Sequence, residues 1–139
     1  MDSVLCIRGI RLDKRIVEIV SEASSELAQI MQQNIHEGKK FVPNAPATIR
    51  RKGFDHPLYE HGDLVNSITY EIIDESNQVT GRIGVFDPEL VEIALINEFG
   101  TDKIPSRPFL RIAFDENIDR ISNQITNKIF DYIEEVIKE

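Results

Sequence analysis

The sequence predicts an α+β fold: a small antiparallel sheet built on a central hairpin, packed by a long N-terminal helix and a long C-terminal helix. Apolar residues recur at three- and four-residue steps near both ends of the chain, and they alternate with polar residues in two central segments. The first period marks one face of a helix and the second one face of a strand. With 139 residues, the chain fits a single domain, residues 1–139.

The N-terminal part predicts a short strand or a lead-in arm over residues 3–10, followed by a helix from about residue 12 to residue 37. Gly38 is a natural stop for this helix. The apolar face of the helix consists of Ile16, Ile19, Val20, Ala23, Leu27, Ile30, Met31 and Ile35.

Residues 38–62 form a long connection that is rich in proline and glycine and differs in charge from the rest of the chain. Residues 39–56 hold five basic residues and one acidic residue, so this stretch carries +4 and leaves −12 elsewhere. Its basic residues could contact DNA phosphates, pair with an acidic face of a neighbouring copy, or simply be solvated. They are Lys39, Lys40, Arg50, Arg51 and Lys52.

The central hairpin is expected from two alternating segments, residues 67–73 and 79–86. The polar run between them, DESNQ, is typical of a hairpin connection. Gly81 and Gly84 lie in the second segment, which indicates a bulge or a close approach of the backbone to a neighbour.

A shorter helix is predicted from the run Asp87-Pro88-Glu89, which supplies an N-cap, a proline for the first turn and an acid near the positive helix end. This helix would end at Phe99, with Gly100 in the left-handed conformation. Apolar residues also alternate between residues 91 and 95, so a strand remains the alternative.

The last helix is expected to start at Pro108 and to run to the end of the chain, because isoleucines recur every four residues from Ile121. Unbroken, it would have about 29 residues and measure roughly 43 Å. It must therefore span the whole domain, break near Asp115, or project beyond the domain and meet a partner.

Composition argues against several classes of function. A net charge of −8 disfavours broad binding to nucleic acid and to anionic membranes. We find no signal-peptide pattern and no apolar run of membrane-spanning length, so we expect a cytoplasmic start and no membrane partner. Cys6 is the single cysteine; it fits a buried hydrophobe better than a catalytic thiol.

Two alternatives give the chain a chemical role. His56, His61 and Asp63 could form a metal site of a small hydrolase, although their spacing matches no firm metal-binding pattern. The basic stretch 39–52 could instead make the chain a DNA-binding module. We find no cofactor-binding or nucleophile motif and expect neither a cofactor nor a metal.

Two stretches of the chain form a recognisable pair of motifs. The first is Glu98-Phe99-Gly100-Thr101 followed by IPSRPFL at residues 104–110. The second is ATIRRKG at residues 47–53, followed by HPL at 56–58, Gly62, Leu64 and Ser67-Ile68. Together they resemble shared motifs of tailed-bacteriophage neck and tail-completion proteins, a group that includes head–tail joining proteins and the virion-morphogenesis proteins of Mu-like phages.

The resemblance implies a structural virion protein and not an enzyme. Such a protein would form a ring, hexameric or dodecameric, at the head–tail junction of the virion, after assembly in the cytoplasm of a bacterial host. Its neighbours would be connector or head-closure proteins on one side and the tail terminator or tail tube on the other, with packaged DNA close by.

The predicted interface lies in the first of these stretches. Gly100 permits an unusual turn, the prolines stiffen the loop, and Arg107 and Phe109 are residue types that anchor interfaces. Glu98 could pair with Arg107 in the same copy or the next. Alternatively, the apolar residues merely close the domain's own core. The predicted interface set is Glu98, Phe99, Gly100, Arg107, Pro108 and Phe109.

Overall fold

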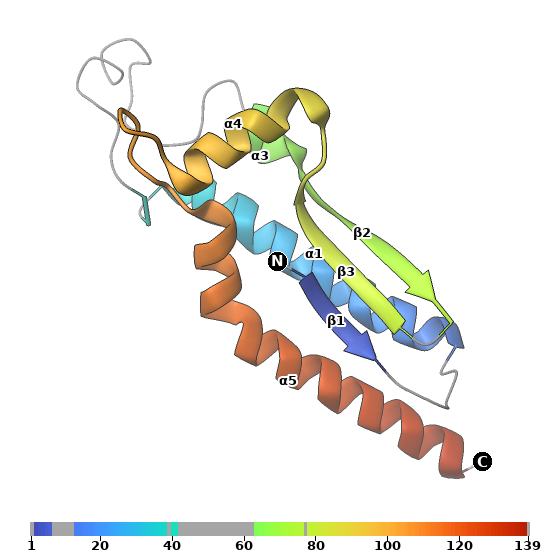
Figure 1. Ribbon diagram of the computed structural model, residues 1–139. Helices are drawn as coiled ribbons and strands as arrows, with labels where there is room; N and C mark the ends of the chain where they lie inside the picture. Colours follow the sequence, from blue (N-terminus) through green and yellow to red (C-terminus); the bar gives the residue numbers. More distant parts are fainter. Residues whose placement is uncertain (1, 7–12, 39, 42–62, 77, 139) are drawn as a thin grey trace.

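The computed structural model describes residues 2–6, 13–38, 40–41, 63–76 and 78–138. Its shape is elongated: a three-stranded sheet lies against one side of the helix α1, and the helix α5 runs beside them (Figure 1). The elements in chain order are β1 (Asp2–Cys6), α1 (Asp13–Glu37), α3 (Asp63–Ser67), β2 (Ile68–Glu75), β3 (Gln78–Val85), α4 (Pro88–Phe99) and α5 (Phe109–Lys138). The predicted α+β class, with long terminal helices around a hairpin, is confirmed.

Helix α1 is the central element, because it contacts both β2 and β3 of the sheet as well as α5. Its apolar face is buried as the periodicity predicted, and Met31 and Ile35 are completely enclosed. The helix ends where we expected. Gly38 has a φ of 70°, and its backbone N–H donates to the carbonyl oxygen of Asn34 at 2.9 Å.

The sheet is antiparallel, with strand order β1-β3-β2. Tyr70 pairs with Ile83 and Ile68 with Val85, so the apolar faces predicted for the two hairpin strands lie on the same side, against α1. The strands extend into the run that we assigned to the connection, as far as Glu75 and Gln78. Their regular one-to-one pairing contains no bulge.

Gly81 fulfils the expectation of a close backbone approach. A Cβ atom at this position would lie 2.1 Å from the Oγ of Ser24 and 3.3 Å from the Cγ1 of Val20, both on α1. The sheet can therefore pack tightly on the helix because this strand position carries no side chain.

Helix α5 is unbroken, so the predicted alternative of a break near Asp115 is wrong. At 1.5 Å per residue its 30 residues measure about 45 Å, and it runs the length of the molecule (Figure 1). Ile121, Ile125 and Ile129 are buried, which confirms the four-residue spacing. Two ion pairs join it to α1: Glu26 with Arg120 at 2.7 Å and Glu22 with Lys128 at 3.1 Å.

Two further helices position the rest of the chain. The alternative of a strand over residues 91–95 is wrong, because Pro88–Phe99 is helical. The short helix α3 was not predicted. It covers residues 63–67 and buries Leu64 and Val65 beneath α4 and beside α1.

We expect Gly81→Ala to lower the free energy of unfolding by about 1–3 kcal/mol, because the added methyl group overpacks the contact between β3 and α1. Chemical denaturation measures the loss. The double variant Gly81→Ala/Ser24→Gly should recover part of it, because the nearest clashing atoms are then gone. If the loss of unfolding free energy in the double variant equals the sum of the losses in the two single variants, the contact with Ser24 does not limit the packing.

Candidate functional site

The candidate site is the corner at which α4 ends and α5 begins. The start of α4 follows the prediction: the side chain of Asp87 accepts a hydrogen bond from the backbone N–H of Glu89 at 3.0 Å, and Pro88 is the first helical residue. At the other end, the backbone N–H of Gly100 donates to the carbonyl oxygen of Ile96 at 2.7 Å.

Gly100 turns the chain out of α4 in a conformation that only glycine adopts readily. Its φ is 72°, positive as expected, but its ψ of 178° lies outside the left-handed helical region that we predicted. A Cβ atom here would lie 2.8 Å from both the carbonyl oxygen of Ile104 and the nitrogen of Ser106. The loop therefore folds back closely over this residue.

Glu98 joins the two helices. Its carboxylate is buried and accepts hydrogen bonds from the backbone N–H groups of Leu110 and Arg111, each at 2.9 Å. These groups lie in the first turn of α5, where helical amides lack partners within the helix and the helix dipole is positive. The residue before the helix, Pro108, has no side chain that can cap it, so a residue of α4 supplies the cap.

The connecting loop is held by further hydrogen bonds to α4 and within itself. The Oγ of Ser106 donates to the carbonyl oxygen of Glu98 at 2.7 Å, and the backbone N–H of Arg107 donates to that of Asn97 at 2.6 Å. Thr101 closes the tip, because its N–H donates to the Ile104 carbonyl oxygen and its Oγ1 accepts the Ile104 N–H. The corner is thus a defined structural unit.

The structure brings the six predicted interface residues together at this corner, but it gives most of their side chains a role inside the chain. Phe109 is fully enclosed in the core, as the alternative reading had it, and Glu98 and Arg107 are buried. The sequence left open a pairing of Glu98 with Arg107 in the same or the next copy; within the described chain, the partners that the structure shows for its carboxylate are the amides of α5. Phe99 differs, because its side chain is 70% exposed.

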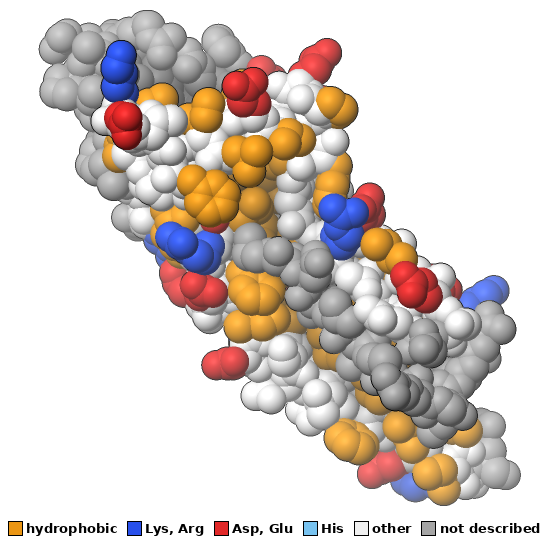
Figure 2. Space-filling model, viewed as in Figure 1, with side chains coloured by type: hydrophobic (Ala, Val, Ile, Leu, Met, Phe, Trp, Pro, Cys, Tyr) orange, Lys and Arg blue, Asp and Glu red, His pale blue; other side chains and the backbone are white. Residues whose placement is uncertain are grey.

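An apolar surface that the sequence analysis did not assign lies beside Phe99. Ile93 and Leu95 of α4 are 47% and 53% exposed, and Ile104 of the loop is also exposed. We call Ile93, Leu95, Phe99 and Ile104 the α4 ridge. Figure 2 shows hydrophobic side chains gathered over α4 and over the first half of α5. The signal in the sequence was the run of residues 90–96, in which every residue except Glu92 is apolar.

The remaining predicted residues are only partly within the described structure. Lys40 is exposed and its Nζ lies 2.6 Å from the Oε2 of Glu116 on α5. Asp63 is exposed at the start of α3. The others, Lys39, Arg50, Arg51, Lys52, His56 and His61, lie outside the described residues. Within the described ranges, no three His, Cys, Asp or Glu side chains gather as a metal site would require.

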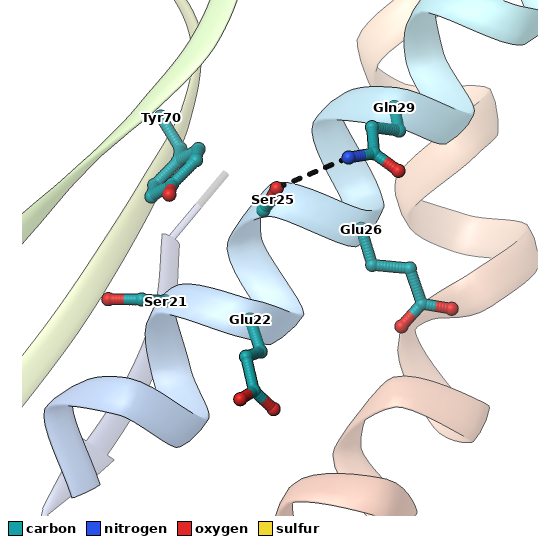
Figure 3. Close-up of a pocket in the computed structure, with 6 residues that line it drawn as sticks. All are labelled: Ser21, Glu22, Ser25, Glu26, Gln29 and Tyr70. Atoms are coloured by element: carbon teal, nitrogen blue, oxygen red, sulfur yellow. Dashed lines mark hydrogen bonds between the residues drawn. The ribbon is translucent and has the colours of Figure 1, made fainter. Parts of the chain in front are cut away.

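A polar hollow of about 350 Å³ lies on the surface of α1 (Figure 3). Tyr70 of β2 faces Ser21 and Ser25 across it, and Gln29 donates a hydrogen bond to Ser25 at 3.4 Å. The two carboxylates of its lining belong to Glu22 and Glu26, which form the ion pairs to α5 described above. The hollow's acidic groups therefore hold two helices together, which makes it a weaker candidate than the corner.

Comparison of the chain with protein-family models, with curated protein sequences and with solved structures gives no match. The motif resemblance to phage neck proteins therefore stands on the quoted residues alone. Among the described helices, none combines the length and the apolar content needed to cross a membrane.

We expect Glu98→Ala to lower the free energy of unfolding by about 2–3 kcal/mol, because two amides of α5 lose a charged acceptor. Glu98→Gln should cost less, because it keeps one acceptor oxygen. Hydrogen exchange at Leu110 and Arg111 should accelerate in both variants. Glu92→Ala on the exposed side of α4 is the matched control; an equal loss of stability there would contradict the role assigned to Glu98.

Proposed function

We propose that the chain is a structural subunit of the neck or tail-completion region of a tailed phage or prophage, and that it works by self-association and docking. The observation that carries the proposal is the exposed α4 ridge. Leu95 and Phe99 each expose more than half of their surface, next to a corner that the chain fixes by hydrogen bonds.

The ridge is unfavourable for an isolated chain. A helix this rich in apolar residues is usually buried over most of its surface, yet the buried residues of α4 are Ala94 and Glu98. Apolar surface withdrawn from water contributes about 25 cal/mol per Å², so covering these side chains would release free energy. Contiguous apolar surface of this kind is typical of a protein–protein contact.

The rigidity of the corner favours docking as well. Because Gly100, the Glu98 cap and the loop hydrogen bonds already fix the backbone, little conformational entropy remains to be lost when a partner binds. The motif that resembles the phage family would then act indirectly: its buried residues hold α4 in place, and α4 offers the contact surface.

A second exposed apolar region lies at the opposite end of the molecule, on the last turns of α5. Its members are Phe130, Val136 and Ile137, the last of them 76% exposed. A partner packed on this end of α5 would cover them. Two separate surfaces suit a subunit that contacts its own copies with one surface and another virion protein with the other.

The two motif stretches supply the phage context. On this proposal the chain forms a closed ring at the head–tail junction, between connector or head-closure proteins and the tail terminator or tail tube. Its place is the virion, and it assembles in the bacterial cytoplasm. Packaged DNA passes close to it.

We expect the double variant Leu95→Ser/Phe99→Ser to stay folded but to lose self-association, because the exposed side chains contribute little to the monomer and much to a contact. Sedimentation velocity and negative-stain class averages of the purified protein measure the change. The matched control is Ile73→Ser, an exposed apolar residue on β2. Rings that persist in the double variant would remove the ridge from the interface.

The phage context needs a separate measurement. Tailed particles purified after infection or prophage induction of the organism that encodes the chain should contain this protein, by mass spectrometry, in a copy number consistent with a ring. Normal tailed particles without any copy of the chain would overturn the proposed function.

A further inference from the structure

We propose that the α4 ridge of one copy binds the later part of the basic stretch of a second copy, residues 42–52; Lys40 and Phe41, just before it, contact their own chain. The inference rests on the proposed function, because it names the surface through which copies associate. It concerns an occupant that must be apolar enough to cover the ridge and basic enough to match the charges around it.

The margin of the ridge is acidic on balance, because Glu89, Glu92 and Asp102 are exposed beside its apolar residues against one exposed lysine, Lys103. Glu89 and Glu92 are exposed on α4 among its apolar residues, and neither takes part in an ion pair within the described residues. Acidic side chains also lie beside the apolar surface in Figure 2. An occupant with Lys or Arg at its edges would gain charge complementarity, whereas an acidic occupant would be repelled.

The other exposed apolar surface of a second copy does not satisfy this condition. The distal end of α5 carries Asp131, Glu134 and Glu135 around its apolar residues, so it would bring like charges to the ridge. The outer end of β2 is acidic as well, with Asp74 and Glu75 exposed. If the ridge contacted either of these surfaces, carboxylates would lie against carboxylates and would repel each other.

The basic stretch offers both the positive charge and the apolar groups that an occupant of the ridge needs. Residues 42–52 hold three basic residues and no acidic residue, whereas the chain as a whole carries −8. The same stretch contains apolar residues, among them Val42 and Ile49, and two prolines, Pro43 and Pro46. Prolines restrict the free chain and so reduce the entropy that binding costs. Apolar and basic groups thus occur together in the combination that the ridge requires.

The contact has a direction. The ridge and the basic stretch are different segments of the same chain. Each copy therefore binds one neighbour through its ridge and another through its basic stretch. Such a heterologous contact repeats from copy to copy and closes into a ring when the rotation between neighbours permits it. Two identical ridges facing each other would instead place Glu89 and Glu92 against their own equivalents.

Two charge reversals test the contact in the full chain. The ridge variant is Glu89→Lys/Glu92→Lys, and the segment variant is Arg50→Glu/Arg51→Glu/Lys52→Glu. Each alone should weaken self-association by at least about tenfold in sedimentation velocity, because every contact then joins like charges. An equimolar mixture should restore the assembly, because alternating copies again pair opposite charges at every contact.

The control is Glu134→Lys/Glu135→Lys at the distal end of α5, which should self-associate as the unaltered chain does. Restoration in one chain carrying both reversals, without restoration in the mixture, would mean that the stretch binds its own ridge and would overturn the inference. Self-association that is unchanged in both charge-reversal variants would also overturn the inference. The proposed function would then be tested by the Leu95/Phe99 variant and by the analysis of tailed particles. An unaltered chain that stays monomeric at every concentration would contradict the contact itself.

Discussion

The bond between the Glu98 carboxylate and the first amides of α5 is the constraint on which the functional end of the molecule depends. The opening amides of a helix have no partner inside the helix, and the dipole makes that end positive. Here Pro108 precedes the helix and the first turn contains no acidic residue, so the anion comes from the end of α4. The last turn of α4 is therefore held against the first turn of α5, and the loop between them must fold back tightly. Gly100, with its φ of 72°, makes that return possible.

This constraint also decides which side of α4 faces outward. Glu98 must point inward to reach α5, and Ala94, one turn earlier, is buried with it. Side chains on the opposite side of the same helix are then directed away from the core, whatever their polarity. Phe99, the next residue along the helix, lies off the buried side and is 70% exposed. The short motif around residues 98–109 thus encodes two things at once: an internal cap, and the orientation of an apolar helix toward solvent.

The local parts of this fold were accessible from the sequence, because their signals are local. The four-residue spacing of Ile121, Ile125 and Ile129 predicted the buried side of α5, and Asp87-Pro88 predicted the start of α4. Alternation predicted which faces of β2 and β3 meet α1. The missed features depend on contacts between distant segments. A five-residue helix such as α3 is too short to show a helical period in its sequence. The hairpin strands end in polar residues, so the sequence predicted strands shorter than those in the structure.

The role of Glu98 shows the same limit at the site. An acid twelve residues before Leu110 gives no sign in sequence that it caps the following helix, because the pairing arises only when the loop folds. From the sequence, Arg107 was one possible partner, in the same copy or the next. The exposure of Leu95 was equally hidden, because an apolar run in sequence normally indicates burial. The proposal that it is a contact surface rests on the conflict between its apolar composition and its exposed position.

Charge then limits how such copies can meet. A chain with a net charge of −8 repels its copies at long range, so burial of apolar surface alone must work against that repulsion. Concentrating five of the basic residues in one stretch changes the balance locally while leaving the rest of the surface acidic. In the proposed contact, the basic stretch of one copy meets the acidic margin of α4 in the next, and opposite charges attract there. Uneven charge would therefore select one orientation between neighbours, which is the property that a subunit needs if its contacts are to close into a ring.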